Sequence, residues 1–205
     1  MRDESDLEYW TWERCCTKIR ELRGRLGFKD SDTLNFLKLN LSLEDGSISD
    51  ELITGRELHP YEVKEIYCIL YGYASSNPVQ ETSKLISFRK IPGGWLYYKP
   101  FTYRALKSIE KAFGSNPEML VRAGELLGGT RAKIGDSSVK LYSLPLIPIT
   151  IVIWAETDEF PASANMFYDS SITNYLSTEQ IVMLSELTAS RLKLALEAKK
   201  VMLRR

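Results

Sequence analysis

The sequence predicts an α+β fold in a single domain, with short antiparallel strands, a buried central helix and long N- and C-terminal helices. Three observations predict this class. Apolar residues recur at helical spacing near both ends of the chain, an apolar helical pattern covers residues 60–73, and short alternating or β-branched runs lie between turn signals. We expect residues 1–205 to form one domain, with residues 1–30 as an N-terminal helix at its periphery.

Composition excludes several classes of protein. Lys and Arg total 27 and Asp and Glu total 27, so no net field favours nucleic acid or an anionic membrane. The most apolar run, residues 144–155, is too short and too broken by prolines to cross a bilayer, and the first residues do not resemble a signal peptide. One histidine and three cysteines, at positions 15, 16 and 68, give no zinc spacing and no iron–sulfur motif. We therefore expect a cytoplasmic protein with buried thiols.

The first half of the chain predicts a helix, a hairpin and a second helix. Apolar residues spaced by three and four predict a helix from Asp6 to Leu26. Alternating leucines predict a strand at 37–43, and the Asp45-Gly46 turn signal a return strand at 47–53. Pro60 opens the central helix, which is apolar around most of its circumference, and His59 precedes it in a capping or bridging position.

The second half predicts further short strands and three helices. These are a strand at 85–88, a Gly-Gly turn and a strand at 95–98 that pairs back, helices at 103–113 and 117–127, a doubly buried β-branched strand at 147–154, and an irregular or helical segment at 161–168. Ser177 and Gln180 form a capping box that begins the last helix.

Three stretches carry a resemblance to a known family. They are ISFRKIPGGWLYYKPFTYRAL from residue 86, LLGG at 126–129, and PLIPITIVIWAETDEFPASANMFYDSSITNYLSTEQ from residue 145. Together they resemble the uncharacterised domain family DUF3786 over roughly residues 66–192. The most specific part is the series Pro-x-x-Pro, Trp, acidic residues and Glu-Phe-Pro-Ala.

The resemblance implies a class of organism and a kind of neighbouring domain, but no activity. It implies a protein of anaerobic archaea or bacteria, and some members carry the domain beside a cysteine-rich iron–sulfur domain of the type seen in corrinoid proteins. This chain has no four-cysteine motif. An iron–sulfur or corrinoid role would therefore come from a partner protein, and the family name records no established activity.

An acidic turn after the strand at 147–154 is one candidate site. Glu156, Asp158, Glu159 and Asp169 supply the hard oxygen ligands that Mg²⁺ and Ca²⁺ prefer, although the spacing is not that of an EF-hand. A pair of these carboxylates could also act as acid and base. The alternative is that the turn carboxylates are solvated and that Asp169 caps a neighbouring segment.

Aromatic residues around the Pro-Gly-Gly turn are a second candidate. A planar organic cofactor with an anionic arm could stack on such a patch and bind Arg104. The residues proposed to bind it are Trp95, Tyr98, Phe101, Arg104 and Trp154, near Arg89, Lys99 and Tyr103. The alternative is a cross-strand aromatic cluster that only stabilises the fold.

Three functional hypotheses follow. The first is a non-catalytic protein that binds a small molecule or cofactor, or an accessory protein, in anaerobic metabolism. The second is a metal-dependent enzyme that uses the acidic turn at 156–159 with Asp169. The third is a structural subunit that forms a homodimer through its long terminal helices.

Overall fold

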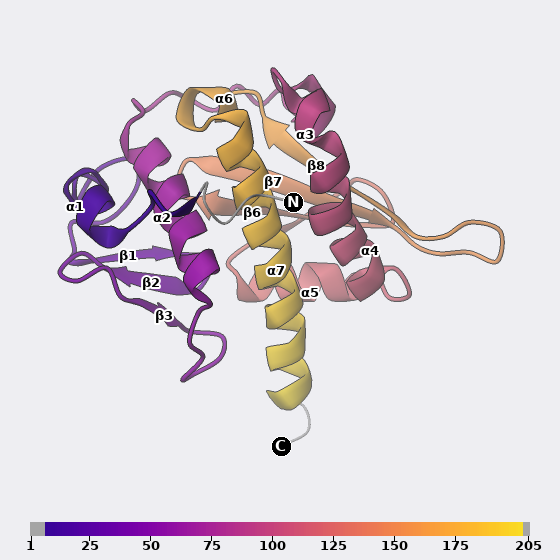
Figure 1. Cartoon of the computed structure of the whole chain (residues 1–205). Helices are drawn as coiled ribbons and strands as arrows, with labels where there is room; N and C mark the ends of the chain where they lie inside the picture. Colours follow the sequence, from indigo (N-terminus) through magenta and orange to yellow (C-terminus); the bar gives the residue numbers. More distant parts are fainter. Residues whose placement is uncertain (1–6, 203–205) are drawn as a thin grey trace.

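A five-stranded antiparallel sheet and a long C-terminal helix form the larger part of the fold (Figure 1). The computed structural model describes residues 7–202, with side chains described through residue 198. In spatial order the strands are β4 (Leu85–Ser87), β8 (Ser163–Asp169), β7 (Ile147–Trp154), β6 (Ser137–Leu144) and β5 (Thr130–Ala132).

Strand β7 is the centre of this sheet because its sequence allows burial on both faces. Every residue from 147 to 153 is buried, as the β-branched run predicts. Ile149 pairs with Leu141 of β6 and Tyr168 of β8, which places these three side chains on one face of the sheet. All three are buried in the main hydrophobic core.

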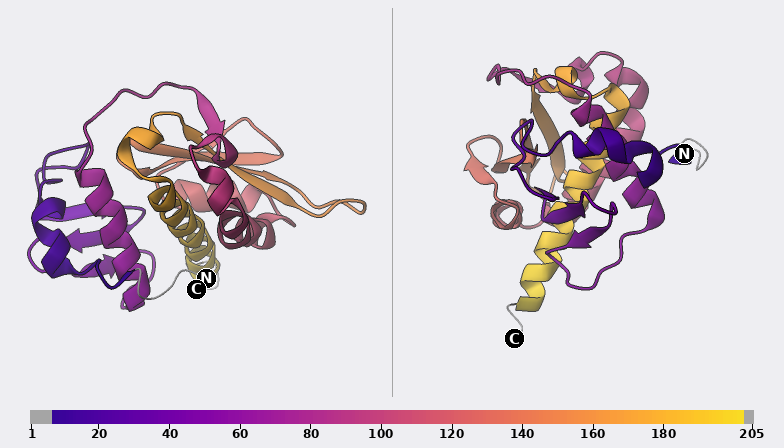
Figure 2. Two further views of the ribbon diagram at one scale, coloured as in Figure 1. Left: turned by 45° about the horizontal axis from the view of Figure 1, so that its top comes forward. Right: turned by 90° about the vertical axis from the view of Figure 1, so that its left-hand side faces the viewer.

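Helices cover this face of the sheet. They are α3 (Gly94–Phe101), a π-helical segment η3 (Thr102–Leu106), α4 (Lys107–Phe113), α5 (Glu118–Leu126) and α7 (Thr178–Met202); η2 (Phe88–Lys90) and α6 (Ile172–Tyr175) are short. Helix α7 packs against α3, α4 and α5 and also against α2 (Pro60–Ala74). Residues 75–84 form the linker that arches from α2 to β4 (Figure 2). No helix within the described residues has the length and apolar composition needed to cross a bilayer.

In the second half of the chain, two segments differ in secondary structure from the sequence prediction. Residues 95–98 belong to helix α3 rather than to a strand, and residues 163–169 form strand β8 rather than an irregular or helical segment. Contacts with neighbouring elements determine the secondary structure of both segments. Strand β8 pairs with β7 along its length, whereas α3 packs against α7.

The N-terminal part forms a smaller layer of three strands and two helices. Strands β1 (Thr33–Phe36), β2 (Leu39–Ser42) and β3 (Ile48–Asp50) form an antiparallel sheet, and α1 (Trp12–Arg20) packs on α2. Helix α1 is shorter than predicted because the chain forms turns over residues 21–27, and Asp6 lies outside the described residues.

A tight turn divides the strand predicted at 37–43. Leu37 and Lys38 connect β1 to β2, and both have positive φ, at 47° and 61°. This conformation suits the right-handed twist of a hairpin but normally favours Asn or Gly. Leu37 is buried, and the backbone carbonyls of both turn residues are bonded to a side chain from α7.

That side chain is Arg191, which is fully buried. Its Nε donates to the Leu37 carbonyl at 2.9 Å, and Nη2 donates to the Lys38 carbonyl at 3.1 Å. The same guanidinium makes a bidentate ion pair with Asp50 of β3, at 2.6 and 2.7 Å. Both side chains are 0% exposed, so this ion pair fastens the three-stranded sheet to α7 in the interior of the protein.

Further charges complete the network. Asp50 also accepts a hydrogen bond from Arg56 at 2.9 Å, and Arg56 reaches Glu62 at 2.7 Å. Burial alone would raise the pKa of Asp50, but hydrogen bonds from Arg191 and Arg56 and the charge of Arg191 outweigh it and lower the pKa to about 2.

The central helix α2 begins and ends as the sequence predicts. The Nδ1 atom of His59 accepts a hydrogen bond from the Tyr61 amide at 3.2 Å and so caps the helix. Near the other end, the Tyr73 hydroxyl donates to the Leu26 carbonyl and accepts from the Leu146 amide. This buried tyrosine therefore joins the N-terminal segment to the β6–β7 turn.

We predict that Arg191→Met lowers the free energy of unfolding by about 3–5 kcal/mol, because it leaves the buried Asp50 carboxylate without its main donor and removes the hydrogen bonds to the Leu37 and Lys38 carbonyls. Urea unfolding of the wild type and the variant measures this change. Arg23→Met is the matched control, since Arg23 pairs with Asp30 and Asp32 only at the exposed surface. Equal losses in the two variants would contradict the assignment.

We predict that Asp50 makes the protein sensitive to acid. An unfolded aspartate has a pKa of about 3.9, so stability from the depressed folded pKa is fully present above that value and is lost as the pH falls toward about 2. The difference in urea midpoint between wild type and Asp50→Asn should narrow over this interval. A difference that stays constant from about pH 5 to pH 2 would show that Asp50 does not titrate as described.

Candidate functional site

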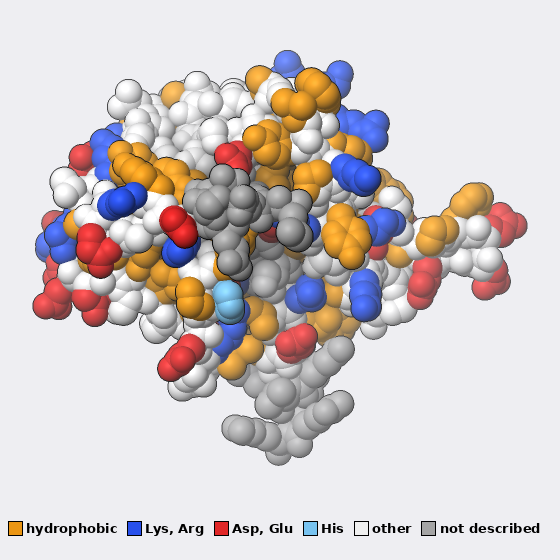
Figure 3. All heavy atoms as spheres, in the orientation of Figure 1, with side chains coloured by type: hydrophobic (Ala, Val, Ile, Leu, Met, Phe, Trp, Pro, Cys, Tyr) orange, Lys and Arg blue, Asp and Glu red, His pale blue; other side chains and the backbone are white. Residues whose placement is uncertain are grey.

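A shallow groove of about 730 Å³ lies on the solvent-facing side of the helix that α3, η3 and α4 build together. Its lining is mainly apolar with three basic side chains, and consists of Tyr98, Lys99, Pro100, Thr102, Tyr103, Arg104 and Lys107. We call this feature the α3–α4 groove. Figure 3 shows basic side chains gathered over these helices.

Local sequence explains why the helix begins where it does. Gly93 adopts a left-handed conformation, with φ of 70°, immediately before the first helical residue. A Cβ at Gly94 would lie 2.3 Å from the Phe88 carbonyl oxygen, so the chain can pass this point only with glycine. The Pro-Gly-Gly signal is therefore a helix start rather than the turn of a hairpin.

The side of this helix that faces solvent is determined by the residues that its other side buries in the core. The Phe101 ring stacks on Phe88, with centroids 4.3 Å apart, and is 0% exposed. Lys99, Tyr103 and Lys107 are spaced by four residues and all line the groove. Tyr103 is 78% exposed, which is unusual for so large an aromatic residue.

The helix is irregular at the groove. Pro100 lies inside α3 and has no amide hydrogen, and residues 102–106 form the π-helical turn η3. Single π-turns of this kind are frequent at functional sites. The Thr102 hydroxyl is buried here without a hydrogen-bond partner among the described residues, although nearly all buried polar atoms have one.

The electrostatics of the groove favour an anion. None of its lining residues is acidic. Arg104 lies 3.5 Å from Glu186, and Lys107 lies 2.6 Å from Glu110, so carboxylates behind the groove partly balance two of the three cations. Arg89 lies 4.0 Å from the centroid of the Tyr98 ring and already covers one face of it.

The structure brings together some of the residues proposed to bind a ring. Tyr98 and Arg104 line the groove, and Trp95 lies one turn earlier on α3 with 74% of its surface exposed. Phe101 is buried beneath the helix and lines no surface. Because the predicted strand at 95–98 is helical, the proposed cross-strand aromatic cluster does not form.

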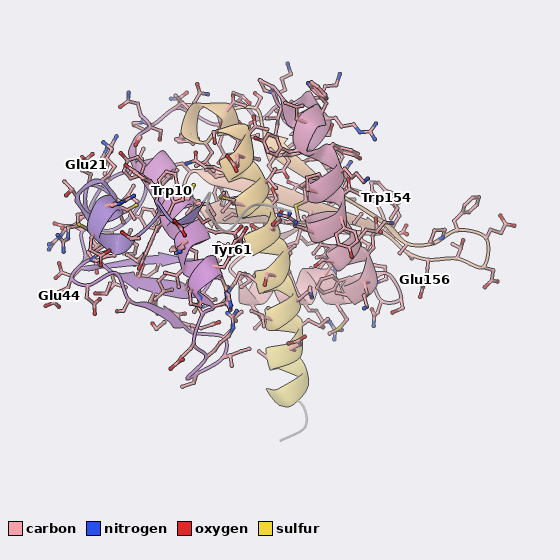
Figure 4. All side chains as sticks on the ribbon, viewed as in Figure 1. Trp10, Glu21, Glu44, Tyr61, Trp154 and Glu156 are labelled. Carbon is pink, nitrogen blue, oxygen red and sulfur yellow. The ribbon has the colours of Figure 1, made fainter. Side chains whose placement is uncertain are left out.

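Trp154 lies apart from this group. It follows Ile153, which is buried in the core, and strand alternation places it on the opposite face of the sheet. There a Cβ at Gly135 would lie 3.3 Å from the Trp154 ring, so the tryptophan packs over the β5–β6 connection. Figure 4 shows Trp154 and Glu156 where the β7–β8 hairpin leaves the body of the protein.

The acidic turn is the tip of that hairpin. Residues 155–162 project from the sheet and carry Glu156, Asp158 and Glu159, all of them exposed (Figure 1). Asp169 lies at the far end of β8, where it pairs with Leu85. The structure therefore does not bring the four proposed metal ligands together. Within residues 7–198, no three His, Cys, Asp or Glu side chains form a metal-binding group.

Asp169 instead holds the linker and the segment after β8. Its Oδ1 accepts hydrogen bonds from the Thr82 amide at 3.0 Å, the Thr82 hydroxyl at 2.9 Å and the Ser171 amide at 2.9 Å. Burial would raise the pKa of Asp169, but these hydrogen bonds from Ser171 and Thr82 lower it to about 2. This is the capping role that the sequence left as the alternative.

Comparison with known proteins adds the family. The profile described as Domain of unknown function (DUF3786) matches residues 19–191. The chain belongs to this family. No curated protein and no solved structure matches it. For this DUF3786 protein, the matched range includes the groove, the hairpin and the Arg191–Asp50 ion pair, so all three lie within the part that defines the family.

Some groove residues of this DUF3786 domain were absent from the predicted site. The predicted patch consists of aromatic residues and nearby basic residues and does not include Pro100, Thr102 or Lys107. The spacing of Lys99, Tyr103 and Lys107 was the available signal, since i, i+4 and i+8 share one face of a helix. Cys15 and Cys68 are buried as predicted, whereas Cys16 is only partly buried, and all three are free thiols.

We predict opposite outcomes for two aspartates. Asp169→Ala should lower the free energy of unfolding by about 1–3 kcal/mol, because it leaves buried donors without an acceptor. Asp158→Ala, in the exposed acidic turn, should leave the urea midpoint unchanged within error. A midpoint lowered equally by both substitutions would contradict this division of roles.

Proposed function

We propose that this protein is a non-catalytic binding or accessory protein, and that its α3–α4 groove binds an organic anion with an apolar or aromatic body. The observation that carries the proposal is the lining of the groove. It combines an exposed tyrosine, a proline and three basic side chains with no acidic one. Such a surface can stack a ring and pair with its negative substituent at the same time.

The form of the groove supports binding rather than chemistry. It is a shallow surface hollow that lacks the enclosed shape of a substrate-sequestering site. Its titratable lining residues are two tyrosines, two lysines and an arginine. No carboxylate or histidine is among the lining residues to act as a general base. The buried Thr102 hydroxyl, which has no partner in the part of the chain that the structure describes, lies at the π-turn and is free to bind a polar group of a ligand.

A planar cofactor with acidic arms belongs to this ligand class, and so does an acidic, aromatic segment of a partner protein. A corrinoid or iron–sulfur partner in anaerobic metabolism stays a prediction from the family resemblance. Binding of Mg²⁺ or Ca²⁺ by the acidic turn likewise stays a prediction from the sequence, and it involves Glu156, Asp158 and Glu159 without Asp169.

We expect the aromatic anion anilinonaphthalene sulfonate to bind this groove and to fluoresce. Tyr103→Ala should weaken its binding about two- to tenfold, the change produced by losing about 0.5–1.5 kcal/mol of stacking. Lys99→Gln should weaken binding mainly at low salt, because exposed charges are screened by ions.

Matched controls lie elsewhere on the surface. Tyr9→Ala removes an aromatic residue that is 51% exposed, and Lys29→Gln removes an exposed lysine of the N-terminal part. Neither should change the affinity for the dye. If the groove variants bind the dye as tightly as the control variants do, the proposed function is wrong.

A further inference from the structure

The projecting hairpin, residues 155–162, has features that its own fold does not use. We call it the acidic arm. Phe160 is 68% exposed near its tip, beside three carboxylates, and the arm contains no basic residue. A large aromatic side chain held out in solvent on a projection is typical of a protein–protein contact.

The arm is held firmly at its base and at its tip. At the base, the Glu156 amide donates to the Gly114 carbonyl at 3.2 Å, and the Ala155 amide donates to the Asp136 carboxylate at 2.7 Å. At the tip, the Thr157 amide donates to the Phe160 carbonyl at 2.9 Å, and the Thr157 hydroxyl accepts from the Phe160 amide at 3.0 Å. These hydrogen bonds hold the backbone that carries Phe160, which lowers the entropic cost of binding.

The α3–α4 groove has the complementary chemistry. Three cations line it against the three carboxylates of the arm, and its apolar floor beside Tyr103 suits an aromatic side chain such as Phe160. In Figure 3, basic side chains lie over the helices that build the groove, and acidic side chains lie on the arm. The arm leads away from the body of its own chain, where a second molecule can reach it (Figures 1 and 2).

We propose that the acidic arm of one copy docks in the α3–α4 groove of a second copy, with Phe160 on the groove floor and Glu156, Asp158 and Glu159 facing Lys99, Arg104 and Lys107. This inference rests on the proposed function, because it names an occupant of the same groove. A two-fold arrangement makes each arm–groove contact twice, which doubles the buried surface and leaves no arm unpaired. It differs from a homodimer built on the terminal helices.

Charge exchange tests this pairing. The arm variant carries Glu156→Lys, Asp158→Lys and Glu159→Lys, and the groove variant carries Lys99→Glu and Lys107→Glu. Either variant alone would place like charges in both arm–groove contacts, and it should sediment as a monomer. A mixture of the two variants restores opposite charges in both contacts of a two-fold dimer, and it should sediment as a heterodimer. The wild type should be a dimer that dissociates as salt is raised.

Phe160→Ala removes the apolar contact and keeps every charge. We expect it to weaken the dimer at least tenfold in sedimentation velocity. Tyr142→Ala is its control, an exposed aromatic residue at the sheet. A wild type that stays monomeric up to about 100 μM, or a dimer that survives both charge-reversed variants, overturns the inference. Failure of the mixture to form a heterodimer, with melting temperatures unchanged, also overturns it.

Measurements of dye binding distinguish a failure of this inference from a failure of the proposed function. If the arm fills the groove, Phe160→Ala should bind anilinonaphthalene sulfonate more tightly than the dimeric wild type. Dye binding that depends on Tyr103 in a strictly monomeric wild type would uphold the proposed function and overturn the arm exchange. A dimer that depends on the arm, without dye binding in Phe160→Ala, would uphold the exchange and overturn small-molecule binding.

Discussion

The buried ion pair between Arg191 and Asp50 is the constraint on which the arrangement of the fold depends. An ion pair with both side chains fully buried is stable only when its hydrogen bonds are complete, and here Arg191 also binds the carbonyls of Leu37 and Lys38. The strained β1–β2 turn, the three-stranded sheet and α7 are therefore positioned by one guanidinium. A chain that packed the N-terminal layer differently would leave a charge in the core.

Helix α7 carries this constraint to the rest of the molecule. On one side it holds the N-terminal layer, and on the other it packs against the helix that contains the α3–α4 groove. Phe101 is buried on the inner side of that helix, which leaves Tyr103 and the basic residues outside. The exposed surface that we propose for binding is thus the unburied side of an element whose other side is fixed in the core.

Much of the fold could be predicted because the relevant signals are local. The burial of β7, the cap at His59 and the Ser177–Gln180 capping box follow from short patterns, and the structure contains all of them. The predictions for residues 95–98 and 163–169 were wrong because aromatic and mixed sequences fit either a strand or a helix. The element that packs against such a segment then determines which of the two it forms. Only part of the groove could be predicted, since the spacing of Lys99, Tyr103 and Lys107 marks one face only if the segment is a helix.

By itself, then, the sequence determined the α+β class, the family and the elements whose periodicity or caps are encoded within a few residues. The tertiary structure decided which charges meet. It joined Asp50 to Arg191 across most of the chain, and it separated Asp169 from the acidic turn by the length of β8. The physical reason is that side-chain ion pairs depend on distance in space, which strand pairing and helix packing set and which sequence spacing does not reveal.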